Sequence, residues 1–574
     1  MTERFVSVQF SRVLTLASLA AVAGGCAGHG SAPGSAPAPA GAPISAADLR
    51  KRLFIYSDDS MEGRETGTIG NVKATNYIAG QVKRLGLQPA GENGTYFVTV
   101  PLIVRAPDTT GTMAVDGASL TRNTDYVVMS PLPSFLPFGT TLNAASVGVV
   151  YGGRLGDAGY ALSAEQIAGK IVVVDPPLGS DGKPDWRFWQ HGGLDRFQGA
   201  AAVAIASLDV SPPQVVEYFG EPQMSLDEGT NSTPTGPLGI LITQAAATKM
   251  LGAAPAGLKP GTAGRTVTAS LRWTVGPSAA AARDVVAILP GSDPALRGEY
   301  VAIGAHNDHL GFNHRPLDLD SLHAFNTIAW NLRGRTPDGA PATPDQLAAI
   351  HVNVDSLRAK HAVRRDSVFK GADDDGSGTV SVLEIAQAMV AAPVKPKRSV
   401  LFVWHTGEEK GLYGSEYFTD HPTVPRDSIV AQLNMDMVGR GDSADIKGGG
   451  PTYLELVGSR RVSTELGDLV ETVNKSEPTP MTFDYTFDAN GHPENIYCRS
   501  DHYEYARYGI PIVFFTTGLH QDYHQLTDEP QYIDYEHMAR VDHLVFDVAL
   551  AVANLEHRPL VDHPKPDPKA PCKQ

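Results

Sequence analysis

The chain has 574 residues, of which 42% are hydrophobic and 19% are charged, a balance typical of folded domains rather than of disordered chains. This length exceeds that of one ordinary domain, so we expect two globular units. Asp and Glu outnumber Lys and Arg by 63 to 47, which gives a net charge of −16. Nucleic-acid binding depends on clustered cationic side chains. We therefore do not expect a nucleic acid to be a partner of this acidic chain.

The first 25 residues have the pattern of an export signal. Arg4 and Arg12 precede an apolar run at 13–23 that is too short to span a bilayer. The small residues before Cys26 are similar to a bacterial lipoprotein processing site, at which the cysteine receives a lipid. We therefore expect a lipoprotein of the bacterial cell envelope, on the periplasmic side or at the outer membrane, that meets the membrane only through this anchor. Plain secretion is the alternative. Residues 26–45, rich in Ala, Gly, Ser and Pro, are predicted to form a disordered tether.

Two amphipathic helices are predicted to open the first part of the main domain, which we place at 46–135. The first helix covers about 44–53, with Ser45 as its N-cap. The second helix covers about 71–85 and ends at a glycine.

Residues 136–275 have a different pattern of residue types. Short β-branched runs alternate with glycines, for example at 147–153 and 169–174, which predicts strands and turns. This segment contains no cluster of acids, bases or metal ligands. We therefore expect a separate β-rich domain inserted into the main one.

The main part of the chain, 280–557, alternates buried-type strands with amphipathic helices. The strands are predicted at 300–304, 399–404, 429–435 and 510–515, and the clearest helix at 379–390. This alternation predicts an α/β fold with a mostly parallel mixed sheet and helices on both faces. The tail at 558–574, rich in Pro and Lys, is predicted to be disordered.

Polar side chains follow each of these four strands, at 305–309, 405–409, 436 and 520–524, and an acidic turn at 371–378 precedes the helix. In such sheets, ligands bind beyond the carboxyl ends of the strands. Imidazoles and carboxylates without thiolates suit zinc, with manganese or cobalt as substitutes. The carboxylates exceed what one zinc needs, so we expect two cations, an arrangement that serves hydrolysis.

Each motif alone has a simpler interpretation. A His-x-Asp sequence is usually incidental, a Glu-Glu pair is usually a solvated surface pair, and the acidic turn would fit a surface turn or a weak calcium loop. The turn lacks the Glu at its twelfth position that an EF-hand requires. The placement of all of them at one sheet edge favours a shared site.

In this order, the motifs resemble those of the two-zinc aminopeptidase family that includes bacterial leucyl aminopeptidases, aminopeptidase Y and glutamate carboxypeptidase II. The resemblance covers about 46–130 and 280–557, and the insert resembles the protease-associated domain that many members carry. It implies a metallopeptidase with two Zn²⁺ ions that hydrolyses peptides, foremost as an aminopeptidase. Together with the export signal, it leads us to expect an exported enzyme.

The resemblance also implies five metal ligands. His306 and Asp436 would complete one zinc site, and Glu409 and His524 would complete the other. Asp374 would bridge the two ions, because it occupies the aspartate of a Gly-Ala-x-Asp-x-x-Ser-Gly pattern.

By the same resemblance, Glu408 would be the general base that activates a metal-bridging water. Asp308 would orient His306 through its ring N–H. The peptide bond between Asp374 and Asp375 would be cis. Four further histidines near the motifs are at positions that bind no metal in the family: His309, His405, His502 and His520.

One departure from the family pattern is a long segment, 313–370, between the His-x-Asp motif and the acidic turn. It contains a helix start at Thr343-Pro344 and a predicted helix to about residue 362. We expect this insertion to lie over or beside the cleft and to restrict substrate size. The alternative is a surface decoration without a role.

Three other functions stay open. A receptor-like binding protein with a dead site would have lost ligands, whereas none is missing here. A carboxypeptidase would need a cationic pocket, for which Arg440 and Arg499 are candidates, and a glutaminyl cyclase would hold one zinc. Cys498 and Cys572 would form a disulfide or remain free thiols.

Overall fold

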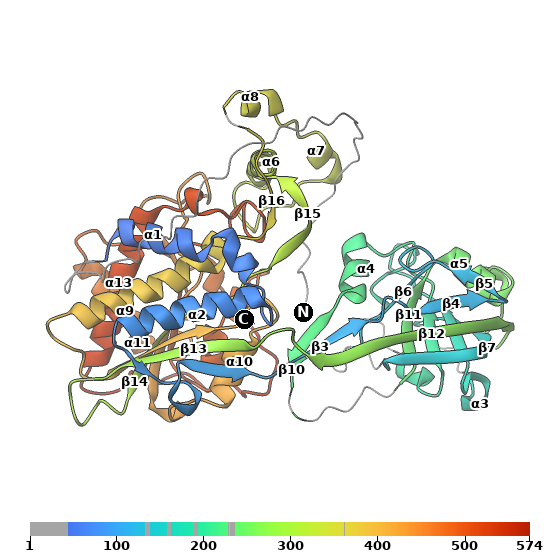
Figure 1. Cartoon of the computed structure of the whole chain (residues 1–574), viewed down its shortest axis with the longest axis horizontal. Helices are drawn as coiled ribbons and strands as arrows, with labels where there is room; N and C mark the ends of the chain where they lie inside the picture. The colour runs from blue at the N-terminus through green and yellow to red at the C-terminus, as the bar shows by residue number, and fades with distance from the viewer. Residues whose placement is uncertain are drawn as a thin grey trace, which may run out of the picture. The chain divides into compact units, whose positions relative to one another are not determined.

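The computed structural model describes residues 44–131, 138–157, 162–188, 193–227, 229, 236–360 and 362–574. They form two compact units (Figure 1). The smaller unit is Pro101–Pro277, and the larger unit combines the described residues up to Val100 with Ser278–Gln574. The predicted export signal, Cys26 and most of the predicted tether lie outside the described residues. No helix among the described residues has both the length and the apolar composition that a membrane span requires.

Nine strands of the larger unit's described residues form one mixed sheet. Its centre is four mutually parallel strands in the order β17-β14-β18-β21, and antiparallel neighbours, β13 and β19, flank them. The predicted mostly parallel mixed sheet is confirmed. The strands are β1 (Gln88–Pro89), β2 (Phe97–Val100), β13 (Ala282–Leu289), β14 (Tyr300–His306), β17 (Ser399–His405), β18 (Ile429–Met435), β19 (Tyr453–Val457), β20 (Thr482–Asp484) and β21 (Ile512–Thr516).

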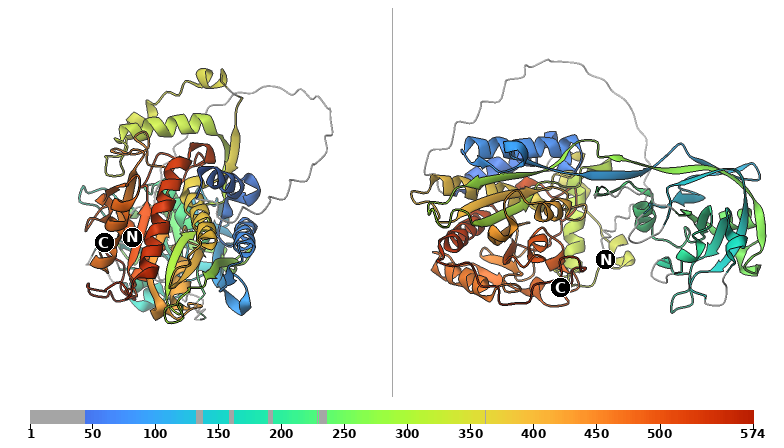
Figure 2. Two further views of the ribbon diagram at one scale, coloured as in Figure 1. Left: turned by 90° about the vertical axis from the view of Figure 1, so that its left-hand side faces the viewer. Right: turned by 90° about the horizontal axis from the view of Figure 1, so that it is seen from below.

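Helices cover both faces of this sheet, because its strands are apolar on both sides. In β17, Val400, Phe402 and Trp404 pack into one core, and Leu401 and Val403 pack into another. The first core is completed by five helices, which are labelled in Figure 1 and seen again in Figure 2: α1 (Ala46–Tyr56), α2 (Ile69–Arg84), α9 (Gly378–Ala391), α11 (Thr464–Ser476) and α13 (Tyr535–Asn554). The second is completed by α10 (Tyr413–Asp420) and α12 (His502–Ala506).

The first predicted helix is α1, and its N-cap is confirmed. The side chain of Ser45 accepts a hydrogen bond from the backbone N–H of Asp48 at 3.1 Å. The second predicted helix is α2. The helix predicted from residue 379 is α9, whose residues up to Gln387 are all buried.

The smaller unit is built around a sheet of ten strands in the part that the structure describes. Strands β7, β8, β9 and β11 are parallel to one another, and the other pairings are antiparallel. The strands are β3 (Leu102–Pro107), β4 (Thr112–Val115), β5 (Ala118–Leu120), β6 (Tyr126–Val128), β7 (Thr141–Arg154), β8 (Ile171–Asp175), β9 (Ala202–Ile205), β10 (Gln223–Leu226), β11 (Leu238–Ile242) and β12 (Ala263–Pro277). Three helices accompany them: α3 (Ala164–Ile167), α4 (Pro213–Gly220) and α5 (Gln244–Leu251).

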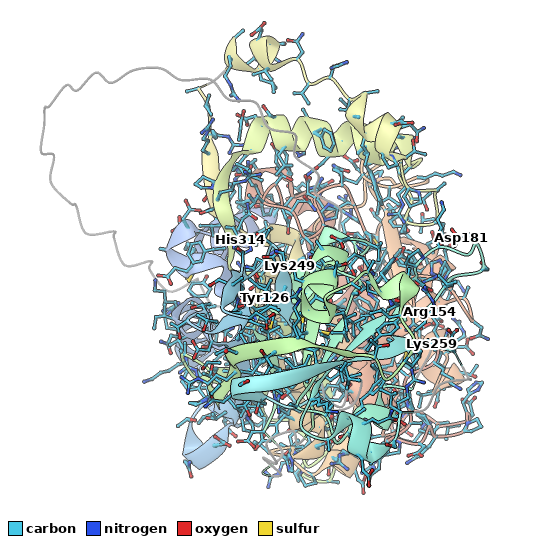
Figure 3. All side chains as sticks on the ribbon, turned by 90° about the vertical axis from the view of Figure 1, so that its right-hand side faces the viewer. Tyr126, Arg154, Asp181, Lys249, Lys259 and His314 are labelled. Atoms are coloured by element: carbon cyan, nitrogen blue, oxygen red, sulfur yellow. A yellow bond between two sulfur atoms is a disulfide. The ribbon has the colours of Figure 1, made fainter. Side chains whose placement is uncertain are left out.

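The border of this unit differs from the predicted one. Residues 101–131 belong to the smaller unit, although the sequence had placed 46–135 in the main domain. The reason is long-range strand pairing, since β3 pairs with β10 and β12, β4 with β12, and β6 with β11. Among the described residues, every group of at least three possible metal ligands lies in the larger unit. Arg154 and Lys249, which are labelled in Figure 3, belong to the smaller unit.

The insertion at 313–370 leaves and rejoins the larger unit through a two-stranded antiparallel sheet of β15 (Phe312–Asp318) and β16 (Arg365–Val368). Between them lie α6 (Leu319–Leu332), α7 (Pro344–Ala348) and α8 (Val354–Arg358). The helix start at Thr343 is confirmed, because this residue forms a capping box with Gln346. The predicted single helix is wrong, since the chain breaks between α7 and α8.

The tail at 558–574 is not a disordered appendage as predicted. A disulfide joins Cys498 to Cys572, whose Cα atoms lie 5.8 Å apart. The side chain of Gln574 donates to the carbonyls of Phe487 and Ala489 and accepts from the backbone N–H of Tyr497. A covalent link and three hydrogen bonds thus order a segment whose composition alone predicts disorder.

We expect Cys572→Ser to lower the free energy of unfolding by about 2–4 kcal/mol, because a cross-link over 74 residues restricts the unfolded chain. Urea unfolding followed by circular dichroism measures the effect. The control is the wild type in reductant, which should unfold like the variant. Equal midpoints for the oxidised wild type and the variant would contradict this role of the disulfide.

Candidate metal centre

The residues predicted to form the site lie together at the carboxyl ends of the four parallel strands. His306 ends β14, Glu408 and Glu409 follow β17, Asp436 follows β18, and His524 lies in the loop after β21. Asp374 comes from the acidic turn before α9. Because parallel strands direct their carboxyl ends to one edge, residues more than two hundred positions apart meet there.

The first group of ligand atoms is built around His306. Its Nε2 lies 3.1 Å from Oδ1 of Asp374 and 3.7 Å from Oδ1 of Asp436. Ser500 donates a hydrogen bond of 2.7 Å to the other oxygen of Asp436, so the carboxylate is fixed with one oxygen towards the imidazole.

The second group is built around His524. Its Nε2 lies 3.0 Å from Oδ2 of Asp374 and 3.0 Å from Oε2 of Glu409. Asp374 therefore presents one oxygen to each group. This is the placement expected of a carboxylate that bridges two cations.

These distances fit metal ligation. Donor atoms bound at about 2.0–2.1 Å to a tetrahedral zinc lie about 3.3 Å from one another. A single ring nitrogen of His524 cannot donate one proton to two carboxylates, but it can share a cation with both. His306, Asp374, Glu409 and Asp436 are all buried, with at most 7% of each residue exposed, and buried carboxylates require a cationic partner.

The protonation of the site leads to the same conclusion. Burial lowers the pKa of His306, but the neighbouring carboxylates of Asp436, Asp308 and Asp374 raise it well above the usual value. Burial likewise opposes a charged His524, whose pKa Glu409 nonetheless raises well above the usual value. Without metal, protons on two imidazoles balance the buried acids. Divalent cations would supply that charge instead and release the protons.

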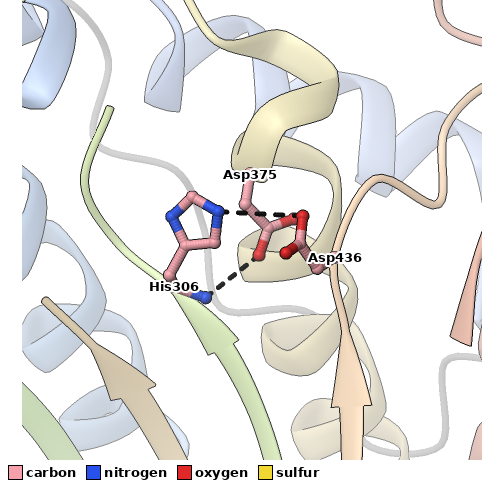
Figure 4. A group of neighbouring side chains, drawn as sticks. All are labelled: His306, Asp375 and Asp436. Carbon is pink, nitrogen blue, oxygen red and sulfur yellow. Dashed lines mark hydrogen bonds and ion pairs between the residues drawn. The ribbon is translucent and has the colours of Figure 1, made fainter. Parts of the chain in front are cut away.

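Asp375 also lies near His306 and Asp436, and the three form a compact group in Figure 4. However, its Oδ2 accepts the backbone N–H of His306 at 3.0 Å, and its Oδ1 accepts that of Gly378 at 2.9 Å. Because backbone donors engage both oxygens, we assign Asp375 to holding β14 against the start of α9. The peptide bond between Asp374 and Asp375 is cis, as the family resemblance implied.

His309 belongs to the site, although sequence reasoning gave it no role. Its Nδ1 lies 2.8 Å from Oε1 of Glu409 and 4.0 Å from Oδ2 of Asp374. His524 lies 3.0 Å from both acids through one atom, whereas His309 is close to Glu409 alone. We therefore assign His524 as the second ligand and His309 to orienting Glu409. The signal in the sequence was its position, directly after Asp308 in the His-x-Asp motif.

Asp308 lies between His306 and the loop that carries Glu408. Its Oδ1 is 3.6 Å from Nδ1 of His306, slightly beyond hydrogen-bond length, and accepts the backbone N–H of Glu408 at 3.2 Å. Thr66 donates to its other oxygen at 2.6 Å. Asp308 thus fixes the predicted base relative to the first group. The carboxylate of Glu408 itself lies 4.0 Å from Nε2 of His306.

A cleft of about 430 Å³, measured with its open mouth, adjoins these groups. Its acidic lining residues are Asp374, Glu408 and Asp436. The apolar part of the lining, here called the apolar side, consists of Met437, Phe487, Ile496, Phe514 and Leu519. Arg499 and Tyr523 also border the cleft.

Residues 284–549, slightly less than half of the chain, match the sequence profile of Peptidase family M28. This part of the chain belongs to that family.

Curated relatives of this chain include two fungal proteins. Leucine aminopeptidase 1 of Coccidioides posadasii is 32% identical over 199 residues, which are 32% of this chain and 48% of that protein. Leucine aminopeptidase 1 of Paracoccidioides brasiliensis is 31% identical over 177 residues, which are 29% of this chain and 43% of that protein. The matched segment spans less than half the length of each. Among solved structures, an aminopeptidase from Aneurinibacillus sp. strain AM-1 is 17% identical, with a TM-score of 0.47, over 91% of this chain and 97% of that one.

Other polar residues near the M28 site have partners of their own. His520 lies 3.1 Å from Asp373, and His405 lies between Asp284 and the hydroxyl of Tyr505. His502 stacks on Phe514, with ring centres 4.7 Å apart. Arg440 is buried and bonded to Asp445 and Asp522. These groups form the walls of the centre rather than its ligand set.

We expect Asp374→Ala to remove both metal ions from the M28 centre, because each group loses one carboxylate oxygen. Elemental analysis of the purified protein measures the stoichiometry. Asp373→Asn is the matched control, since Asp373 contacts His520 and the backbone N–H of Gly439 instead and should keep both ions. Two ions retained in Asp374→Ala would refute the bridging role.

Proposed function

We propose that the protein is an exported two-zinc aminopeptidase that removes apolar residues from the N-termini of peptides. The observation that carries the proposal is the position of Asp374, shared between two buried ligand groups beside an apolar cleft. Membership of a peptidase family supports the reaction class. The names of the fungal relatives, leucine aminopeptidase 1, support the choice of the N-terminus.

The roles of the residues follow from their positions. His306, Asp374 and Asp436 would hold one cation, and Asp374, Glu409 and His524 the other. When bound, these cations acidify water and polarise a carbonyl. Glu408, fixed by Asp308 through its backbone, takes the proton of the attacking water and returns it to the leaving amine.

The charges at the cleft favour an aminopeptidase over a carboxypeptidase. The charge of Arg440 is engaged by Asp445 and Asp522, and that of Arg499 by Glu494 at 3.0 Å and by the hydroxyl of Tyr523. Neither guanidinium therefore offers its full set of N–H donors to a substrate carboxylate.

The other two candidates fit the centre less well. A binding protein with a dead site would lack part of the ligand set, whereas the five predicted ligands and Glu408 meet here. A glutaminyl cyclase would need one zinc, whereas Asp374 faces two ligand groups.

Export and a lipid anchor at Cys26 are part of the proposal. The disulfide between Cys498 and Cys572 supports export, because disulfides persist in oxidising compartments. We propose that the smaller unit is a protease-associated domain, which its glycine-punctuated strands support.

We expect Glu408→Gln to lower kcat by about 10²–10⁴-fold, because the amide cannot accept the proton of the attacking water. The number of bound ions should not change, since Glu408 lies outside both ligand groups. Steady-state kinetics on leucyl peptides together with elemental analysis separates the two effects. Wild-type turnover in this variant would remove Glu408 from the role of base.

We expect the purified protein to cleave leucyl peptides with a free N-terminus and to leave their N-acetylated forms intact. Mass spectrometry of the products identifies the bond that is cut. A chelator should abolish cleavage, and added Zn²⁺ should restore it. Release of the C-terminal residue from acetylated peptides would identify a carboxypeptidase, and pyroglutamate formation would identify a cyclase.

A further inference from the structure

The apolar side of the cleft depends on one loop with little secondary structure. This pocket loop, residues 485–499, contributes Phe487, Ile496 and Arg499 to the lining. Apart from two short 3₁₀ turns it has no regular structure. Contacts from outside the loop must therefore fix its shape.

One of these contacts comes from the tail. Gln574 and the Cys498–Cys572 disulfide hold the pocket loop, as described above. The opposite contact comes from the insertion, through residues 330–339, the insertion turn. Nε2 of His492 lies 3.0 Å from Oδ1 of Asp338, and a guanidinium nitrogen of Arg333 lies 3.5 Å from Oε1 of Glu494.

The insertion turn is built to present these two residues. Arg333 donates to the backbone carbonyls of Pro337 and Gly339, which closes the turn around Asp338. The indole N–H of Trp330 donates to the carbonyl of Asp445 at 2.5 Å, and the N–H of Lys447 donates to the carbonyl of Arg335 at 2.8 Å. These hydrogen bonds attach the insertion turn to residues 445–447 of the larger unit, independently of its contacts with the pocket loop.

Two chains of side-chain contacts connect the insertion turn to residues that line the cleft. Beyond Asp338, the ring of His492 packs edge-on against Phe487, with centres 5.2 Å apart. Beyond Arg333, the other oxygen of Glu494 accepts from Arg499 at 3.0 Å. Arg499 in turn donates to the hydroxyl of Tyr523 at 3.1 Å, and that ring stacks on His524.

We propose that Arg333 and Asp338 are positioning residues that set the width of the apolar pocket and so determine which N-terminal side chains the enzyme accepts. This inference rests on the proposed aminopeptidase function. The Arg333–Glu494 ion pair and the Asp338 side chain are partly exposed, so these two contacts contribute little to global stability. Their loss should therefore loosen the pocket loop without unfolding the protein.

The test is the double variant Arg333→Ala/Asp338→Ala in the full chain, assayed on leucyl and alanyl anilides. A looser pocket loses contact with a leucine side chain but little with alanine. We expect kcat/KM for the leucyl substrate to fall about tenfold, through KM, and the alanyl value to change less than about twofold. The kcat and the number of bound ions should stay at the wild-type level.

Two control variants separate positioning from general damage. Arg358→Ala breaks contacts with Asp318 and Asp320, which lie inside the insertion and not in the pocket loop, so it should keep the wild-type preference. Arg333→Lys with Asp338 intact keeps a positive charge facing Glu494 and should recover most of the leucyl activity. An unchanged leucyl-to-alanyl ratio in the double variant, or the same loss in Arg358→Ala, would overturn the proposal.

Hydrogen exchange tests the same inference without catalysis. Amides of residues 485–499 should exchange about tenfold faster in the double variant and at the wild-type rate in Arg358→Ala. Unchanged exchange in the double variant would overturn the positioning role even if the wild type proved inactive on all peptides. An inactive wild type would instead count against the proposed function alone.

Discussion

The shared position of Asp374 is the constraint on which the rest of the site depends. Its two oxygens face His306 and His524 at 3.1 and 3.0 Å in a buried setting. Burial and the Glu409 carboxylate oppose ionisation of Asp374, yet hydrogen bonds from the two histidines lower its pKa below the usual range. A carboxylate kept ionised at the centre of an acidic, buried cluster is stable only beside positive charge. The geometry and the electrostatics thus both favour positive charge on each side of this one residue.

The turn that carries Asp374 is fixed by segments that are distant in sequence. The buried guanidinium of Arg64 donates to the carbonyls of Lys370 and Gly371 at 2.7 and 2.8 Å. On the other side, the carboxylate of Asp528 accepts the backbone N–H groups of Asp373 and Asp374. The N-terminal segment and the loop after β21 therefore clamp the turn between them. This explains why residues around 60–67, which contribute no ligand, belong to the same folding unit as the metal centre.

The parts of this arrangement that follow from local patterns were predictable. Strand periodicity, the polar residues after each strand and the rule that parallel strands end at one edge were sufficient to bring His306, Glu409 and Asp436 together. The parts that depend on long-range pairing were not. Residues 101–131 join the smaller unit because β3 pairs with β12, more than 160 positions away. The sequence pattern of 101–131 does not identify the strand with which it pairs. The tail is ordered by one disulfide and the hydrogen bonds of one glutamine, and such single interactions cannot be predicted from amino-acid composition. His309 was missed because only the fold shows that its ring faces Glu409 at 2.8 Å.

The insertion explains how a metal centre of this kind can vary its substrates without moving its ligands. It lies between His306 and Asp374 in sequence, yet β15 and β16 pair so that the chain leaves and returns at one place, where the N–H of Phe369 donates to the carbonyl of Gly311. The clamp on the acidic turn acts only at the last residue of the insertion, Lys370, and beyond it, so changes around residues 330–339 need not shift Asp374. That segment, through Arg333 and Asp338, contacts the loop that shapes the apolar side of the cleft. Chemistry and selectivity therefore rest on separate sets of contacts, which permits selection to alter the second while the first stays fixed.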